Sequence, residues 1–162
     1  MKTKIIIALL ALASTLNAAD VLKAPPPAAK TSWSDSIGLD AVAIARGKDF
    51  RDVDYSGGLR LSYDLTARLG LVLEAEGRDA HGVLVDSTFA GVKFALPLGK
   101  TIRPYLLGGV GLKFPHHDEY AAGGAGLEYA RGAWRIFAEA MAEKSRSSDA
   151  TFRVTSGIGF RF

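Results

Sequence analysis

The chain has 162 residues, a length that fits one domain, and it contains no cysteine. The absence of thiols excludes a disulfide framework and zinc–thiolate sites. The formal net charge of +3 at pH 7 falls to +1 if Lys2 and Lys4 leave with a cleaved N-terminal segment, so charge does not indicate nucleic acid binding.

Residues 1–19 have the layout of a secretory signal peptide. Two lysines precede an apolar run over residues 5–16, and small residues follow at Ala18 and Ala19. A membrane anchor is the alternative, but the run is shorter than the roughly 20 residues that a spanning helix needs. We therefore expect cleavage after Ala18 or Ala19.

Residues 20–32 are rich in proline and alanine. Pro25, Pro26 and Pro27 disfavour both a helix and a sheet interior, and they favour an extended polyproline segment. We expect this stretch to be a tether outside the folded domain, which then comprises residues 33–162.

Apolar and polar residues alternate with period two from Trp33 onward, and no stretch shows a helical period over several turns. The expected strands cover residues 36–45, 55–65, 68–77, 87–96, 101–114, 120–130, 133–143 and 151–162. Short connections at 64–67, 97–100 and 130–133 alternate with longer polar ones at 46–54, 77–86, 115–119 and 144–149. This pattern predicts an all-β, eight-stranded antiparallel up-and-down barrel.

Alternation is shared by two kinds of barrel. A soluble barrel turns its apolar face inward, whereas a membrane barrel turns it toward lipid and keeps a polar lumen. The polar face here is rich in glycine, which weakens a strand facing water but makes room inside a narrow barrel. These glycines are Gly38, Gly58, Gly70, Gly91, Gly109, Gly111, Gly124, Gly126, Gly157 and Gly159.

The same polar face carries seven basic and seven acidic residues, a balance that a closed interior requires because unpaired buried charge is costly. We expect the core of this lumen charge network to be Asp40, Arg60, Glu74, Glu76, Lys93, Arg103, Glu128, Arg135, Glu139 and Arg153; Asp64, Lys113, Glu143 and Arg161 complete the fourteen.

The aromatic residues gather near the strand ends of the apolar face, while the strand middles hold aliphatic residues and alanine. Tyr63, Phe94, Tyr129, Trp134, Phe160 and Phe162 lie toward the short connections, and Tyr55, Phe114 and Phe152 lie toward the longer ones. Two aromatic girdles around an aliphatic band match the two interfaces of a bilayer. Together these features favour a transmembrane barrel, closed by pairing of the last strand with the first.

Several segments together resemble a known group of proteins. The export signal, the KAPPP tether, RPYLLGGVGL, GGAGLEY and the terminal GIGFRF are similar to the small OmpA-like and OmpX-like outer-membrane β-barrels of Gram-negative bacteria, including surface antigens of alphaproteobacteria. The resemblance implies export through the periplasm to the bacterial outer membrane. It also implies that periplasmic chaperones and the barrel assembly machinery handle the chain, with Ile158, Phe160 and Phe162 as the assembly signal.

Metal binding has two candidate loops. His116, His117, Asp118 and Glu119 offer imidazole and carboxylate ligands, but adjacent residues rarely converge on one ion. Asp49, Asp52 and Asp54 lack the spacing of an EF-hand loop. We expect neither a metal nor a cofactor.

The loop over residues 46–54 also carries basic residues that suit lipid phosphates. Arg46, Lys48 and Arg51 are expected at the surface, where they can contact lipopolysaccharide. Outer-membrane lipid and lipopolysaccharide are therefore the expected partners, nucleic acid is not, and the barrel is expected to be a monomer.

The hypothesis that we favour is a non-enzymatic envelope barrel with a polar, charge-paired and plugged lumen, serving envelope integrity or surface interaction such as adhesion. One alternative is a narrow small-solute channel, which eight strands and long charged side chains disfavour. The other is a lipid-modifying barrel enzyme built on His81, Asp86 and Ser87, although Ser87 is expected to face the lumen.

Overall fold

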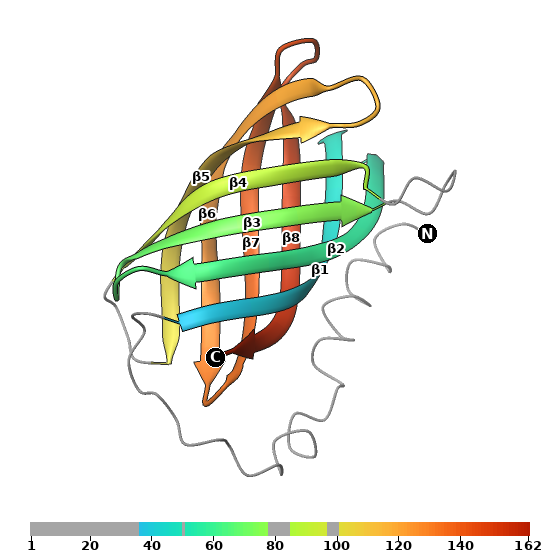
Figure 1. Ribbon diagram of the computed structural model, residues 1–162. Helices are drawn as coiled ribbons and strands as arrows, with labels where there is room; N and C mark the ends of the chain where they lie inside the picture. The colour runs from blue at the N-terminus through green and yellow to red at the C-terminus, as the bar shows by residue number, and fades with distance from the viewer. Residues whose placement is uncertain (1–35, 50, 78–84, 97–100) are drawn as a thin grey trace.

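The alternating segments form eight antiparallel strands that close into one barrel in the computed structural model, which describes residues 36–49, 51–77, 85–96 and 101–162 (Figure 1). The expected export signal and tether, and His81, lie outside these residues. The strands are β1 (Ser36–Asp49), β2 (Asp52–Asp64), β3 (Leu69–Gly77), β4 (Ser87–Ala95), β5 (Ile102–Lys113), β6 (Asp118–Arg131), β7 (Trp134–Ser145) and β8 (Thr151–Arg161).

Each strand pairs with its neighbours in sequence, and β8 returns to β1 in the register Leu39 with Phe160. Next to this ladder, the backbone amide of Phe162 donates to the carbonyl of Ile37 at 2.8 Å, and the amide of Ile37 donates back at 3.3 Å. The predicted all-β, eight-stranded up-and-down barrel is confirmed. The near strands β1–β4 cross the far strands β6–β8 steeply in Figure 1, as the strand tilt of a closed barrel requires.

No helix in the described ranges is long and apolar enough to cross a membrane.

The burial pattern is the reverse of that in a water-soluble protein. Leu59 and Val110 are 61% and 64% exposed on the outer surface, whereas Arg153 has no exposed area and Glu76 only 1%. Apolar residues normally leave water and charged ones stay in it. The outer surface therefore suits an apolar solvent.

The interior also contains apolar and aromatic side chains, so it is less uniformly polar than the alternation in the sequence predicts. They form two clusters, one of Val72, Phe89, Ala95, Tyr105, Leu107, Tyr120, Ala122 and Met141, and one of Val42, Ile44 and Phe137. Glycine makes the space for them. A Cβ at Gly126 would lie 2.5 Å from the Tyr105 ring, and one at Gly157 would lie 2.5 Å from the Phe137 ring.

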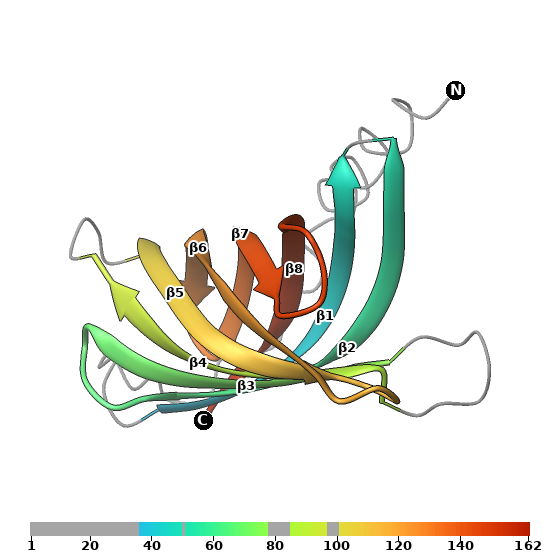
Figure 2. The ribbon, with the colours of Figure 1, turned by 90° about the horizontal axis from the view of Figure 1, so that it is seen from above.

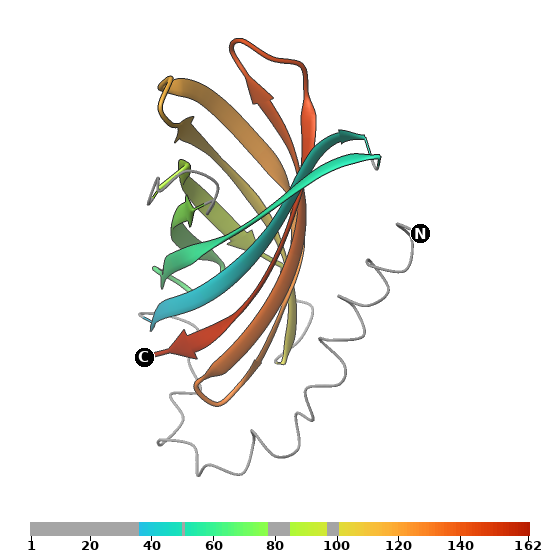
Figure 3. The ribbon, with the colours of Figure 1, turned by 90° about the vertical axis from the view of Figure 1, so that its right-hand side faces the viewer.

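The connection after β1 is much shorter than predicted. Residues 46–54 were expected to form a long loop, but β1 continues to Asp49 and β2 begins at Asp52, with an irregular register between Gly47 and Asp49. Asp49 allows the tight turn because its Oδ1 accepts from the backbone amides of Arg51 and Asp52 at 2.7 and 3.0 Å. The β1–β2 hairpin consequently stands out beyond its neighbours in Figure 2 and Figure 3.

Two adjacent glycines of β5 provide a matched test of close strand packing. A Cβ at Gly109 would point inward and overlap the carbonyl oxygen of Ala90 and approach the Cα of Gly91 to 2.6 Å, whereas one at Gly108 has its nearest heavy atom 3.9 Å away. We expect Gly109→Ala to lower the free energy of unfolding in lipid vesicles by about 1–3 kcal/mol, because backbone cannot move aside. Gly108→Ala, with the same loss of chain entropy in the unfolded state, should be neutral or stabilising. Equal urea midpoints for the two variants would contradict this packing.

Candidate functional site: the charged interior

The end of the lumen near the β1–β2 and β3–β4 connections holds a cluster of ion pairs centred on Arg46. The Arg46 guanidinium forms a fork to Glu76, with N–O distances of 2.9 and 3.0 Å, and its Nε donates to Glu143 at 3.0 Å. Lys113 pairs with the same Glu143, and the Ser87 hydroxyl donates to Glu76 at 2.7 Å. These five side chains connect β1, β3, β4, β5 and β7 across the interior.

A second cluster at mid-height is centred on Arg60. Its Nε donates to Glu74 at 2.9 Å, and its Nη1 donates to Glu139 at 2.9 Å. The Tyr105 hydroxyl also donates to Glu139, at 2.8 Å, and Arg153 pairs with Glu74. Arg60 is thus shared between two carboxylates on strands that lie on opposite sides of the barrel.

A third cluster lies toward the opposite end of the lumen. Lys93 Nζ lies 2.8 Å from Asp64 Oδ1 and 3.1 Å from Glu128 Oε2. Arg103 Nη2 lies 3.4 Å from Asp64 and 3.6 Å from Glu128. The four residues alternate in charge, so each carboxylate is shared by two cations.

The Arg135 guanidinium adds a fork to this end of the lumen. Its Nε donates to Asp40 at 2.5 Å, with a second contact from Nη2, and its Nη1 lies 4.0 Å from Glu128. Forked contacts of this kind fix both the position and the orientation of the partners.

Cations and carboxylates are close to balance inside the barrel. The inward-facing cations are Arg46, Arg60, Lys93, Arg103, Lys113, Arg135, Arg153 and Arg161, and the inward-facing carboxylates are Asp40, Asp64, Glu74, Glu76, Glu128, Glu139 and Glu143. Because the desolvation of each ion costs several kcal/mol, such an interior is tolerated only if its charges satisfy one another.

All ten residues expected in the lumen network lie buried in this interior, and each takes part in at least one of the ion pairs described above. Arg46 was placed wrongly: it was expected on a surface loop, yet its side chain is inside. The signal was available, because Arg46 shares the parity of Asp40, Val42 and Ile44. The polar composition of residues 46–54 favours a loop, and this masks the alternation at Arg46. Lys48 is exposed and lies 3.5 Å from Asp149.

The expected girdle residues lie on the outer surface or at its ends. Tyr55, Tyr63, Phe94 and Tyr129 are exposed, as are the proposed assembly residues Ile158, Phe160 and Phe162. Trp134, Phe114 and Phe152 are half-buried; Trp134 packs on Phe160 with ring centroids 3.8 Å apart. Phe114 was expected to end a strand, but β5 stops at Lys113 and Phe114 lies in the connection, where its ring meets that of His117.

The candidate metal loops show no convergent ligands. Among the described residues, no group of three or more histidine, aspartate or glutamate side chains is arranged to hold an ion. The Asp118 carboxylate accepts from the Ser147 hydroxyl at 2.8 Å, and Asp49 is engaged by the backbone of its own turn.

Ser87 is buried and faces the lumen, as expected. The carboxylate to which it donates, that of Glu76, also receives the Arg46 fork and the Ser56 hydroxyl. A carboxylate with that many donors balances charge and is poorly placed to accept a further proton from a nucleophile.

No protein-family model matches the chain, and no curated protein matches it. Solved structures do. The N-terminal β-barrel domain of Pseudomonas aeruginosa OprF matches with a TM-score of 0.61 at 19% identity, covering 80% of this chain and 98% of that one. A de novo designed transmembrane β-barrel matches with a TM-score of 0.57 at 16% identity, covering 80% and 97%.

The attachment invasion locus protein Ail of Yersinia pestis matches with a TM-score of 0.49 at 19% identity, covering 78% of this chain and 97% of that one. At these identities the OprF domain and the designed barrel establish the fold: an eight-stranded barrel of the transmembrane type.

Arg60 provides the sharpest test of the charged interior. We expect Arg60→Ala to lower the free energy of unfolding by about 3–5 kcal/mol, because two buried carboxylates lose a cation. Adding Glu139→Ala should recover part of this loss, since Glu74 still has Arg153. The matched control is Lys48→Ala, which removes a cation from an exposed pair and should change stability by about 0–1 kcal/mol. Urea unfolding in lipid vesicles measures all three, and a loss for Arg60→Ala no larger than that for Lys48→Ala would argue for a hydrated lumen.

Proposed function

We propose that the chain is a non-enzymatic β-barrel of the bacterial outer membrane, with an interior plugged by paired charges, and that it serves envelope integrity or surface attachment. The observation that carries this proposal is the inverted distribution of residues: an aliphatic outer surface around an interior in which buried cations and carboxylates alternate. That distribution is stable only where lipid, and not water, surrounds the outer surface of the barrel.

The dimensions support a membrane location. The strands have 9 to 14 residues, and a tilted strand needs about 9–11 to cross a bilayer. Closure of β1 on β8 leaves no strand edge with unpaired backbone groups, which lipid does not tolerate. The likeness to designed transmembrane barrels supports the same conclusion.

The filling of the lumen favours a plug over a pore. An eight-stranded barrel is just wide enough for side chains to occupy its interior. Here the Arg60 guanidinium lies 4.4 Å from the centre of the Phe137 ring, and Lys93 Nζ lies 5.9 Å from that of Tyr105, so aromatic rings occupy space that a water column would need.

The exposed ends and the biogenesis complete the proposal. The mixed charges at the ends of β1, β2 and β7, including Lys48 and Arg51, face the leaflet that contains lipopolysaccharide, which is the proposed lipid partner.

Cleavage after residue 18 or 19 would leave residues 20–32 as a periplasmic tether. Periplasmic chaperones and the barrel assembly machinery would then insert a monomer that needs no cofactor and binds no nucleic acid.

Planar-bilayer recording tests the plug, and mass spectrometry of lipid A incubated with the refolded barrel tests for catalysis. We expect no stepwise conductance and no change in lipid mass. Stable conductance steps that are absent from protein-free bilayers would favour the narrow channel, and loss or gain of an acyl chain would favour the lipid-modifying enzyme.

Phe162 tests the proposed assembly signal. We expect Phe162→Ala to reduce the amount of folded barrel in the outer membrane several-fold while export across the inner membrane continues, because the aromatic side chain is the proposed recognition element. Phe152→Ala, at the opposite end of the same strand, is the control and should insert normally. Heat-modified mobility on a gel reports the folded fraction; equal insertion of both variants would remove Phe162 from the signal.

A further inference from the structure

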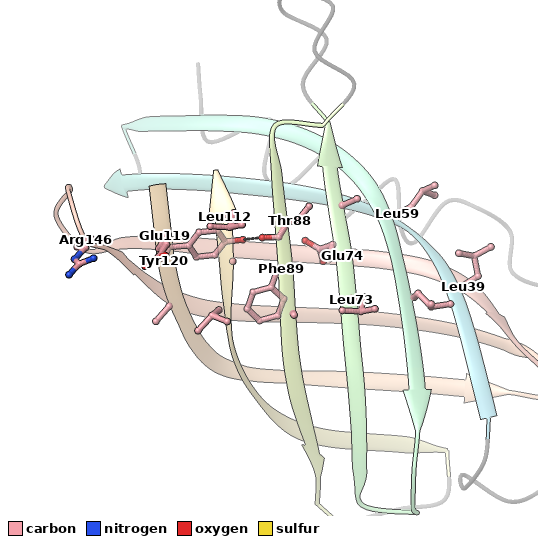
Figure 4. Close-up of a pocket in the computed structure, with 16 residues that line it drawn as sticks. Leu39, Leu59, Leu73, Glu74, Thr88, Phe89, Leu112, Glu119, Tyr120 and Arg146 are labelled. Atoms are coloured by element: carbon pink, nitrogen blue, oxygen red, sulfur yellow. Dashed lines mark hydrogen bonds between the residues drawn. The ribbon is translucent and has the colours of Figure 1, made fainter. Parts of the chain in front are cut away.

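The outer surface has an apolar hollow that runs across six strands. It has a volume of about 910 Å³ and is lined chiefly by outward-facing residues of β1 to β6, together with Arg146 from the connection after β7. Figure 4 shows Arg146 and Glu119 at one end and Leu39 at the other.

The register explains the course of the hollow. Two parallel rows of outward side chains cross the strands as direct cross-strand neighbours, one of Leu39, Leu61, Leu73, Ala90, Val110 and Ala121 and one of Leu59, Ala75, Thr88, Leu112 and Glu119. Leu39 is close to the start of β1, and Glu119 is close to the start of β6 at the opposite end of the barrel. The rows therefore climb obliquely toward the end of the barrel at which β6 starts.

The hollow covers more than half of the apolar thickness of an outer membrane. Six neighbouring strands are separated by five gaps of about 4.8 Å, so a row is roughly 24 Å long. Because the strands tilt by about 35–45°, this row rises by about 14–17 Å along the barrel axis, within an apolar band about 25 Å tall. Small side chains lower the surface along the rows. Ala75 lies between Leu59 and Thr88, Ala90 lies between Leu73 and Val110, and Ala121 follows Val110. The rows therefore form a groove wide enough for an extended hydrocarbon chain.

The end of the groove near the start of β6 is cationic. The β1–β2 turn and the β7–β8 connection lie at this same end of the barrel, which we call the loop end. Arg146 lines it, and its backbone amide donates to the carbonyl of Glu119 at 3.2 Å, which holds the two residues side by side. Lys144 is exposed, is the cross-strand partner of Ala121, and its Nζ donates to the Ser148 carbonyl at 2.8 Å. The neighbouring carboxylate of Asp118 shares the inward parity of Tyr120 and accepts from the Ser147 hydroxyl at 2.8 Å. The outward side of this end therefore carries two cations and the carboxylate of Glu119, which favours an anion at the depth of a lipid headgroup.

We propose that the groove is a binding site for one phosphorylated lipid of the loop-side leaflet, with an acyl chain lying across β1–β6 and a phosphate at Lys144 and Arg146. This inference rests on the membrane location proposed above and identifies the surface that recognises the lipid. Each cation near a phosphate contributes roughly a fivefold change in affinity, which corresponds to about 1 kcal/mol. The apolar contact with the alanines supplies the remainder and restricts binding to this face.

The test is a titration of the refolded full chain in neutral detergent micelles with bisphosphorylated lipid A, followed by native mass spectrometry. We expect Lys144→Ala with Arg146→Ala to weaken binding about 25-fold. Removal of the phosphates from the lipid should weaken binding to the unaltered chain and abolish the effect of that double variant. The matched control is Arg68→Ala with Arg131→Ala, two exposed cations at the opposite end of the barrel and outside the groove, which should stay within about twofold.

A second pair of variants tests the apolar part. Ala90→Phe fills the groove and should weaken binding about tenfold, whereas Ala138→Phe adds the same ring to an outward position of β7 outside the groove and should have little effect. If the two phenylalanine variants weaken lipid binding equally, the lipid is ordinary annular lipid. If the two double alanine variants weaken it equally, the attraction is general to the surface. Either result overturns the site. A chain that does not acquire heat-modified mobility in any amphiphile counts against the proposed membrane function instead.

Discussion

The structure depends on one constraint: in an apolar surrounding, every backbone amide and carbonyl must find its partner within the protein. A ladder of strands meets this demand only if its two edges meet. Here β8 returns to β1, and the hydrogen bonds between Ile37 and Phe162 extend the pairing to the last residue of the sequence. Closure in turn creates an interior, and the interior has to be filled.

The filling combines three kinds of residue that depend on one another. Glycines such as Gly126 and Gly157 remove side-chain volume from the wall, and Tyr105 and Phe137 occupy that volume. The aromatic rings narrow the space left for water, which strengthens the attraction between charges and raises the penalty for any charge without a partner. Sharing of carboxylates, as Arg60 and Arg153 share Glu74, is how the barrel meets that requirement.

The outer surface is shaped by the same geometry. Strand tilt turns a row of cross-strand neighbours into a path that climbs obliquely along the barrel, so small residues that are far apart in sequence line up into one groove. Ala90 and Ala121 belong to this path because of register, while Ala138 on β7 lies outside it. The lipid-facing side of a small barrel can therefore carry a specific feature even though its composition is plain.

The sequence by itself determined which side the residues of the predicted strands face, because alternation with period two is a local property. It predicted eight strands and an inward position for the ten residues of the expected network. It failed at residues 46–54, where polar composition indicates a loop but Asp49 forms a tight turn that lengthens both strands. Only the tertiary structure decided which residues meet. Arg46 and Glu143 are 97 positions apart and Arg60 and Glu139 are 79 apart, and their contact depends on the stagger of strands around a closed barrel, a global quantity that no local pattern of residues contains.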